Sequence, residues 1–230
     1  MAMNRSEINQ AIRAAEVFFA ANHFHLPPLA FWRPEEWRGR PGLAEIVACH
    51  LGWDVTDFGL GDFARQGLLL FTLRNGVAGN GRYGKPYAEK IMVAREEQKT
   101  ILHYHRRKTE DIINRGGGKL CFRLFDRDGE RGLSPQPVRV SRDGVATTVA
   151  AGETVTLCPG ESLTLTPGLF HEFWAAKGAG PVLIGEVSSV NDDHYDNVFY
   201  ESQERFPEII EDEPPYRLLV GDVQAYTGRQ

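Results

Sequence analysis

Two histidines and a glutamate in one short segment have the types and spacing of metal ligands. The segment HYHRRKTEDIINRGGG begins at His103. Because residues i and i+2 of a β-strand project from the same face, His103 and His105 can direct both imidazoles to one point while Tyr104 faces away. Glu110 follows where the strand can turn back and bring a carboxylate to that point. His171, in LTPGLFHEFW, is the fourth candidate ligand.

Three imidazoles and one carboxylate form a donor set that suits a divalent transition metal. Mn²⁺, Zn²⁺, Fe²⁺, Co²⁺ and Ni²⁺ are all compatible with these ligands, so the donor set alone does not name the ion. A six-coordinate ion held by four protein ligands keeps two positions that adjacent substrate oxygens can fill. Such an ion polarises a carbonyl group and stabilises the negative charge that develops beside it.

The remaining histidines are not expected to bind metal. His23 and His25 form a second HxH pair, but no carboxylate follows at the right distance and the prolines at 27–28 interrupt a strand soon after it. We assign this pair a structural or dimer-surface role. His50 and His194 are single histidines without a ligand pattern around them.

The composition is that of one globular domain that does not bind nucleic acid. The chain has 230 residues, of which 42% are apolar, a net charge of −5 and a pI of about 5.8. This length suffices for a full hydrophobic core. The acidic balance offers no basic surface for nucleic acid. No stretch of the sequence is long and apolar enough to span a bilayer, so no membrane partner is expected.

The N-terminus and the cysteines predict a cytoplasmic protein. The opening MAMNRSEINQ is polar and lacks the apolar core of a secretory signal. Cys49, Cys121 and Cys158 are scattered without a CxxC pair. This pattern is typical of reduced thiols in the cytoplasm.

A helical segment is predicted over about residues 1–60. Ser6 can cap a helix that starts at Glu7. Apolar residues then recur at helical spacing, namely Ile8, Ile12, Ala15 and Phe19. The segment RPEEWRGRPG and residues 43–50 are expected to form short helices between prolines and glycines.

A β-structure is predicted over about residues 64–190. Turn pairs such as Asn75-Gly76 interrupt runs rich in β-branched and aromatic residues. Frequent short strands without alternating helices favour a mainly all-β sandwich or barrel. The acidic, proline-rich part, residues 191–230, is expected to wrap this core. We expect residues 1–230 to form a single domain.

The ligand pattern on such a chain resembles the cupin superfamily. Its first motif, HxHxxxxE followed by a glycine, matches His103, His105, Glu110 and Gly117. Its second motif, a proline and a glycine ahead of a histidine, matches Pro167, Gly168 and His171. The resemblance implies a cupin double-stranded β-helix, or jelly-roll barrel, behind the N-terminal helical segment.

Three positions depart from the cupin motifs. Glu97 stands where the first motif usually opens with a glycine. Thr166 stands at the usual place of the second motif's proline, and Ala175 replaces an asparagine that often ends it. These positions shape turns, so the departures leave the ligand set intact.

Longer strings are similar to one family of cupins, the D-lyxose isomerases. They are FHLPPLAFW with the PEEW that follows, YAEKIMVAREEQKTILHYHRRKTEDIINRGGG, and LTPGLFHEFW, and the resemblance covers nearly the whole chain. It implies a homodimeric sugar isomerase that uses a divalent metal, usually Mn²⁺. It also implies interconversion of D-lyxose and D-xylulose and, more slowly, of D-mannose and D-fructose.

Isomerisation needs a base that moves a proton between C2 and C1, through a metal-stabilised cis-enediolate. Glu110 is occupied as a ligand, so our first choice is Glu186, in VLIGEVSSV. It faces the pocket if Val182 and Ile184 share its side of the strand. A carboxylate in an otherwise apolar strand is unusual unless it is paired or functional. An exposed strand carboxylate is the alternative.

Four further residues are candidates for contacts with the substrate. Lys108 could donate to O1 or O2 during proton transfer, and Lys90 shares one side of its strand with Met92 and Ala94. Both lysines could instead lie on the surface. Phe170 and Trp174 flank His171 and are expected to form an apolar wall of the pocket, or part of the core.

Other functions use the same four ligands. A cupin dioxygenase or oxalate-type oxidoreductase would carry them in a more apolar pocket. A phosphosugar isomerase would hold its phosphate with Arg106, Arg107 and Lys108. A non-enzymatic sugar-binding cupin is disfavoured because the ligand set is complete. The sequence does not choose the physiological sugar, nor between proton transfer and a hydride shift.

Overall fold

Most of the β-structure lies in two antiparallel sheets. The computed structural model describes residues 2–77, 79, 83–193, 195–201 and 208–227. Within these residues the larger sheet has eight strands. In spatial order they are β10 (Val145–Val149), β9 (Val138–Arg142), β12 (Ser162–Leu165), β6 (Glu110–Gly117), β14 (Val182–Ser189), β4 (Tyr87–Ala94), β3 (Leu68–Arg74) and β2 (Gly52–Thr56).

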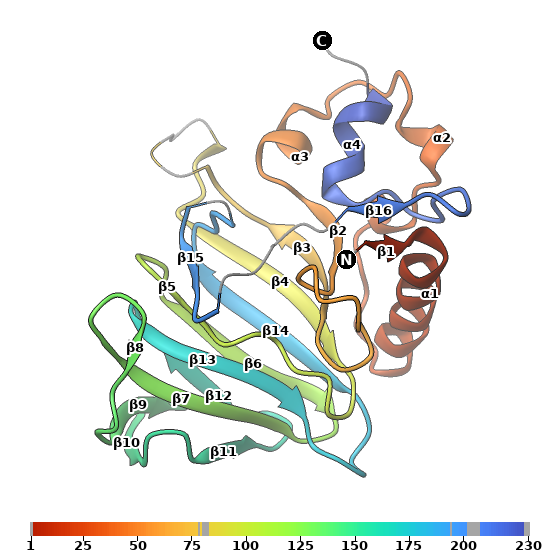
Figure 1. Cartoon of the computed structure of the whole chain (residues 1–230). Helices are drawn as coiled ribbons and strands as arrows, with labels where there is room; N and C mark the ends of the chain where they lie inside the picture. The colour runs from red at the N-terminus through yellow and green to blue at the C-terminus, as the bar shows by residue number, and fades with distance from the viewer. Residues whose placement is uncertain (1, 78, 80–82, 194, 202–207, 228–230) are drawn as a thin grey trace.

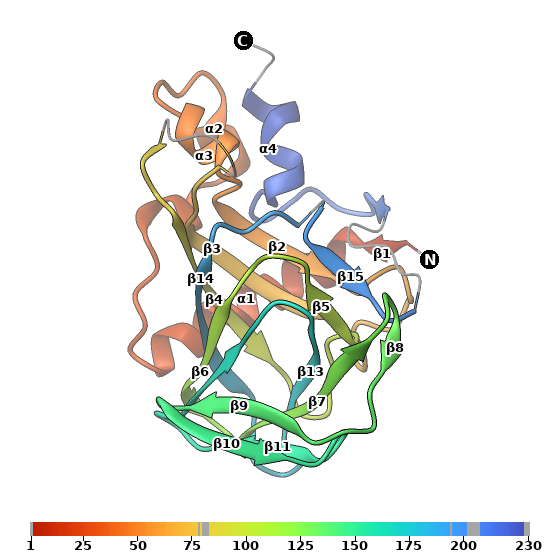
Figure 2. The same ribbon diagram turned by 90° about the vertical axis from the view of Figure 1, so that its left-hand side faces the viewer.

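The second sheet faces the first and completes a barrel. Its described strands run in the order β11 (Thr154–Leu157), β7 (Leu120–Asp128), β13 (Leu169–Ala175), β5 (His103–His105) and β15 (Asn197–Phe199). The short β8 (Gly132–Leu133) pairs with β7. The two sheets curl toward each other, and β9, β10 and β11 lie at one end of the barrel (Figure 2). This is the mainly all-β barrel that is expected from the sequence.

Apolar side chains from both sheets fill one half of the barrel interior. Each strand alternates inward and outward residues, so both inner faces contribute to one core. Met92, Ile112 and Ile184 enter it from the larger sheet, and Phe122 and Phe173 from the smaller one. The remaining interior holds the polar residues described below.

The helical segment expected near the N-terminus is present, and it covers the outer face of β2, β3 and β4 (Figure 1). The long helix α1 (Arg5–Ala21) packs its apolar stripe against the sheet; the stripe consists of Ile8, Ile12, Ala15 and Phe19. The helix begins two residues before the expected start at Glu7. Ser6 does not cap it, because the Ser6 N–H and hydroxyl both donate to Asp212. A 3-10 turn η1 (Pro28–Phe31) and two short helices, α2 (Pro34–Trp37) and α3 (Ala44–Ala48), follow.

The C-terminal part joins these helices. Helix α4 (Val220–Thr227) packs beside α2 and α3 through Leu218, Val223, Trp37 and Leu43. The two-residue strand β16 (Ile209–Ile210) pairs in parallel with β1 (Met3–Asn4). These elements form a cap at one side of the barrel (Figure 1).

Two boundaries expected from the sequence are wrong in the structure. β2 is a sheet strand inside the expected helical segment of residues 1–60. β15 pairs with β5 although it lies in residues 191–230, which we expected to wrap the core. β15 has only three residues and follows a run of Asn and Asp, so no alternating pattern indicates it.

One glycine of the first cupin motif is required by geometry. Gly117 ends β6 with φ of +80°, a conformation that side chains other than glycine rarely adopt. A Cβ atom there would lie 2.3 Å from the carbonyl oxygen of Pro181. The motif glycine therefore allows β6 and the start of β14 to approach closely.

No helix among the described residues is long and apolar enough to cross a membrane. The three cysteines are all free, with Cys49 and Cys121 buried and Cys158 exposed. This agrees with the expectation of reduced thiols.

Candidate active site

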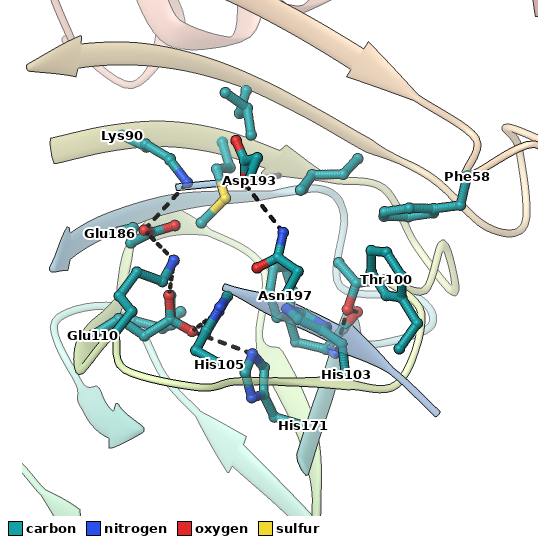
Figure 3. A pocket seen from close by; sticks show the side chains of 17 residues that line it. Phe58, Lys90, Thr100, His103, His105, Glu110, His171, Glu186, Asp193 and Asn197 are labelled. Carbon is teal, nitrogen blue, oxygen red and sulfur yellow. Dashed lines mark hydrogen bonds and ion pairs between the residues drawn. The ribbon is translucent and has the colours of Figure 1, made fainter. Parts of the chain in front are cut away.

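Three imidazoles and a carboxylate meet inside the barrel. His103 and His105 project from β5, and His171 lies directly opposite His103 on β13. The potential ligand nitrogens of the three rings all lie within 4.8 Å of one another. Glu110, the first residue of β6, places Oε1 3.4 Å from His105 Nε2 and 3.2 Å from His171 Nε2 (Figure 3). The structure thus brings the four residues together.

The hydrogen bonds of two rings leave their Nε2 atoms available to an ion. His103 Nδ1 lies 2.8 Å from the carbonyl oxygen of Ile101, and His171 Nδ1 lies 3.0 Å from that of Leu169. A carbonyl can only accept, so each Nδ1 carries the proton and each Nε2 keeps its lone pair. His171 Nε2 is buried and has no hydrogen-bond partner among the described residues. An orphaned acceptor of this kind fits a metal ligand.

The protonation states also fit a divalent ion, which requires neutral imidazoles and an ionised carboxylate. Burial, together with the neighbouring His171, lowers the pKa of His103 well below its usual value. Burial and Lys108 also lower the pKa of His105. Burial by itself would raise the pKa of Glu110, but Lys108 and His105 outweigh it and hold that pKa well below the usual range.

The turn between β5 and β6 is held by a carboxylate that the sequence did not indicate. Asp196 accepts hydrogen bonds from the backbone N–H groups of Arg107 at 2.8 Å and Lys108 at 3.2 Å. Its Oδ2 also lies 3.6 Å from His105 Nδ1. This residue therefore supports the chain reversal that carries Glu110 back to the histidines.

Beside the four residues runs a buried row of alternating charges. Lys108 Nζ lies 2.7 Å from Glu110 Oε2 and 2.9 Å from Glu186 Oε1. Lys90 Nζ lies 3.4 Å from the same Glu186 oxygen. All four side chains are at most 5% exposed. We call Lys90, Glu186, Lys108 and Glu110 the charge row. Figure 3 labels Lys90, Glu186 and Glu110 beside the histidines.

The charge row fixes the ionisation of its members. Burial would lower the pKa of Lys108, but Glu110 and Glu186 outweigh it and raise that pKa. Burial would raise the pKa of Glu186, but Lys108 and Lys90 outweigh it and lower that pKa. At neutral pH Glu186 is therefore a carboxylate and Lys108 an ammonium ion. Each buried charge is compensated by an opposite one.

Asn191 links the two lysines and was not expected from the sequence. Its Oδ1 accepts from Lys90 Nζ at 2.8 Å and from Lys108 Nζ at 3.3 Å. Its backbone exchanges two hydrogen bonds with the side chain of buried Asn75, at 3.0 and 3.1 Å. Its Nδ2 donates to Asp193, which also accepts from Asn197. The cluster of Asn and Asp directly after the strand of Glu186 is the signal that could have indicated this contribution.

The rest of the pocket has an apolar and a polar part. Apolar side chains lining it are Phe58, Leu68, Leu70, Met92, Ile112, Phe173 and Phe199. Thr100, Asp193 and Asn197 add polar atoms. A polyhydroxylated ligand would find hydrogen-bond partners on one side and apolar surface on the other, as is common in small-molecule sites.

Two expected lining residues lie elsewhere. Phe170 and Trp174 do not line the pocket. Side chains alternate between the two faces of a strand, so Phe170, one residue from the inward-facing His171, and Trp174, three residues from it, both face outward. His171 and Phe173 point inward. Phe170 is buried on the outer side against Tyr104, with ring centroids 4.8 Å apart, and Lys99 lies over Trp174. The expectation of a pocket wall is wrong for both residues, and Phe173 takes that place. Phe170 meets the other expectation, because it lies in a hydrophobic core cluster.

The histidines that we set aside stay apart from the site. His23, His25 and His50 are exposed, and none belongs to a group of potential ligands in the described part of the chain. His194 lies outside the described residues. Lys90, Lys108 and Glu186, in contrast, all line the pocket.

Comparison with known proteins gives one consistent family. The family model described as D-lyxose isomerase matches residues 3–223. The D-lyxose/D-mannose isomerase of Serratia proteamaculans is 51% identical over 219 residues, which cover 94% of this chain and 96% of that protein. The D-lyxose/D-mannose isomerase of Escherichia coli O157:H7 is 46% identical over 226 residues, which cover 97% of this chain and 100% of that protein.

A solved structure shows the same fold at lower sequence identity. The L-ribose isomerase of Cellulomonas parahominis, crystallised with L-ribose, superposes with a TM-score of 0.59. It is 16% identical, and the match covers 91% of this chain and 99% of that one. At this identity the likeness concerns the fold alone.

The imidazole cluster predicts how metal binding responds to mutation. His171→Ala should reduce the metal retained per chain after loading with Mn²⁺ and desalting, measured by inductively coupled plasma mass spectrometry. The loss of affinity should exceed the roughly 10- to 100-fold that removal of an outer partner of a ligand costs. His50→Ala, at an exposed histidine, is the control and should retain the wild-type content. Unchanged metal in His171→Ala would remove this residue from the ligands.

Proposed function

The chain belongs to the D-lyxose isomerase family and is a sugar aldose–ketose isomerase, and from this premise we propose its substrates and mechanism. We propose that it interconverts D-lyxose with D-xylulose and D-mannose with D-fructose. Both family relatives carry the names of these two aldoses. D-lyxose and D-mannose agree in configuration around the reacting carbons, so one site can serve both.

The observation that carries the proposal is the contact between the ligand cluster and the charge row. Glu110 belongs to both, since Oε1 faces the histidines and Oε2 accepts from Lys108. A substrate whose oxygens approach the histidines therefore meets Lys108 and Glu186 directly beside them. Aldose–ketose isomerisation needs this juxtaposition of oxygen-binding groups and a proton-transfer group.

We propose that His103, His105, Glu110 and His171 hold a divalent ion, with Mn²⁺ the expected metal. The buried lone pair of His171 and the ionised Glu110 support this assignment. When bound, such an ion polarises the sugar carbonyl and stabilises negative charge on the neighbouring oxygens.

Glu186 is the proposed base that takes the proton from C2 and returns it to C1. It is ionised and buried, and its contacts with Lys108 at 2.9 Å, Ser188 at 3.1 Å and Lys90 at 3.4 Å all involve Oε1. These contacts hold the carboxylate through Oε1, and Oε2 is the oxygen that we propose faces the substrate. General acid–base catalysis of this kind contributes roughly 100- to 10,000-fold to a rate.

Lys108 is the proposed donor to O1 and O2 of the sugar. It is an ammonium ion held between two carboxylates, so its charge lies beside the place where oxygen becomes anionic. A preorganised donor in a buried site stabilises such charge more strongly than water does. Lys90 has the proposed role of holding Glu186 and, with Asn191, closing this side of the pocket.

The structure favours a free sugar over a phosphosugar. Of the three basic residues after β5, only Lys108 lines the pocket, and its contacts are with Glu110 and Glu186. Arg106 and Arg107 are exposed, and Arg106 pairs with Glu130. The charge row also argues for a polar, polyhydroxylated substrate and against the more apolar pocket of a cupin dioxygenase.

Three expectations from the sequence stay predictions. They are the preference for Mn²⁺ over other divalent metals, assembly as a homodimer, and location in the cytoplasm.

The proposed function is tested with chelator-stripped protein. D-lyxose should yield D-xylulose, and D-mannose should yield D-fructose, only after Mn²⁺ is added back, because the carbonyl is then polarised. Mannose 6-phosphate should react more slowly than both free sugars. Oxygen uptake without ketose formation would instead support the dioxygenase alternative. Ketose detection by enzymatic assay or NMR measures the outcome.

The proposed base is tested by Glu186→Gln. This isosteric change should lower ketose formation at least 100-fold, since an amide cannot accept the C2 proton, while bound metal stays at the wild-type level. Glu172→Gln is a matched control, because Glu172 is also a buried strand glutamate but lies on the outer face of β13 beside Arg123. Activity of Glu186→Gln within about tenfold of wild type would contradict the assignment.

A further inference from the structure

We propose that Phe58 sets the length of sugar that the pocket accepts, by closing the pocket at the end away from the charge row. This inference rests on the proposed function, because it concerns the choice between five-carbon and six-carbon substrates. Phe58 lines the same pocket as the histidines and Glu186. In Figure 3 its ring lies across the pocket from Lys90 and Glu186.

An aromatic pair forms this end of the pocket. Phe58 and Phe199 contact edge to face, with ring centroids 6.2 Å apart, and the Phe199 ring lies 6.0 Å from that of His103. Phe58 is 4% exposed. In the proposed binding mode, a sugar with its reacting carbons beside Glu186 and the histidines directs its remaining carbons away from the charge row and toward these two rings.

The backbone holds Phe58 in a conformation that its side chain disfavours. Its φ is +58°, in the left-handed region that bulky residues rarely adopt. A residue in such a conformation persists only where its surroundings impose it. Strain of this kind is typical of residues that present a side chain to a functional site.

The surroundings that impose this conformation are a network of short hydrogen bonds. The Phe58 N–H donates to Thr56 Oγ1 at 2.9 Å. Asp57, which is 1% exposed, accepts from the N–H groups of Gly59 at 2.9 Å and Gly61 at 2.7 Å. The backbone of the loop is thus fixed from within, which holds the Cα–Cβ bond of Phe58 in its direction.

The two aromatic rings at this end of the pocket favour five-carbon over six-carbon sugars. A hexose has one more hydroxymethyl group than a pentose with the same reacting carbons. Thr100, Asp193 and Asn197 offer polar atoms along the pocket, but the two rings offer none to a terminal hydroxyl group. A hydroxyl group pressed against them loses its hydration without gaining a partner, which is unfavourable. The wild-type pocket should therefore favour the pentose.

A second phenylalanine of the same connection provides a matched control. Phe63 is 6% exposed, close to the exposure of Phe58, but belongs to the apolar cluster beneath α1. It does not line the pocket. Phe63→Leu removes the same volume as Phe58→Leu at a site that does not face the substrate.

The test compares kcat/KM for D-mannose with kcat/KM for D-lyxose. Phe58→Leu and Phe58→Ala should raise this ratio about tenfold, the lower range of what one carbon group is worth in a shaped pocket. Phe63→Leu should leave it at the wild-type value. Leucine and alanine, like phenylalanine, disfavour a positive φ, so the backbone strain at position 58 is retained in both Phe58 variants. A ratio within twofold of wild type in folded Phe58→Leu would overturn the proposal.

A binding measurement separates this inference from the proposed function. The non-reactive polyols D-mannitol and D-arabinitol are the probes, with Kd determined by calorimetry on Mn²⁺-loaded protein. In Phe58→Leu the Kd for D-mannitol should fall relative to the Kd for D-arabinitol, and an unchanged ratio overturns the proposal. If this Kd ratio changes in a protein that isomerises neither sugar, Phe58 still selects ligands by length, but the proposed function is rejected. If the smaller variants fail to fold, Phe58→Trp is used instead. It should lower kcat/KM for D-mannose relative to D-lyxose and weaken the binding of D-mannitol relative to D-arabinitol, and unchanged ratios overturn the proposal.

Discussion

The compensation of buried charge between Lys90, Glu186, Lys108 and Glu110 is the constraint on which the rest of the site depends. Four charges that are almost fully buried are tolerated only because each lies beside an opposite charge. Removing one would weaken this compensation for its neighbours, which is unfavourable in a buried site. The row also orders the chemistry, because it keeps Glu186 ionised and places an ammonium ion between the two carboxylates.

Strand register produces this arrangement. Glu186 on β14 lies directly opposite Lys90 on β4, and Ser188 on the same strand lies opposite Glu110 on β6. Directly opposite residues on neighbouring strands have their side chains on the same face. A slip of one residue would turn the charges outward and the surface residues into the barrel. The apolar half of the interior, with Met92, Ile112 and Ile184 on the same strands, makes such a slip unfavourable and so protects the site.

Local patterns account for what the sequence predicted. The spacing of His103 and His105 implies one face of a strand, and the isolated carboxylate at Glu186 implies a function because its neighbours are apolar. The apolar stripe of α1 follows from helical periodicity in the same way. The errors at Phe170 and Trp174 came from treating neighbours of His171 in sequence as its neighbours in space, whereas the pleat alternates them.

Contributions from distant segments were harder to foresee. Asn191 is held at the end of β14 by the side chain of Asn75, and Asp196 directly precedes β15, which pairs with the edge of β5 but is too short to leave a periodic signal. Phe58 depends on a positive φ imposed by Thr56 and Asp57, which no hydrophobic pattern encodes. Such features arise from tertiary contacts and from backbone geometry, so they appear only in the structure.

In the proposed mechanism, Glu186 carries a proton between C2 and C1 of the sugar. The most direct measurement is NMR of the ketose formed from D-lyxose in D₂O. Proton transfer through a carboxylate predicts deuterium at C1 of D-xylulose, because the abstracted proton exchanges with solvent before it is returned. Complete absence of deuterium from C1, with turnover intact, would contradict the claim and indicate direct hydrogen transfer between the two carbons.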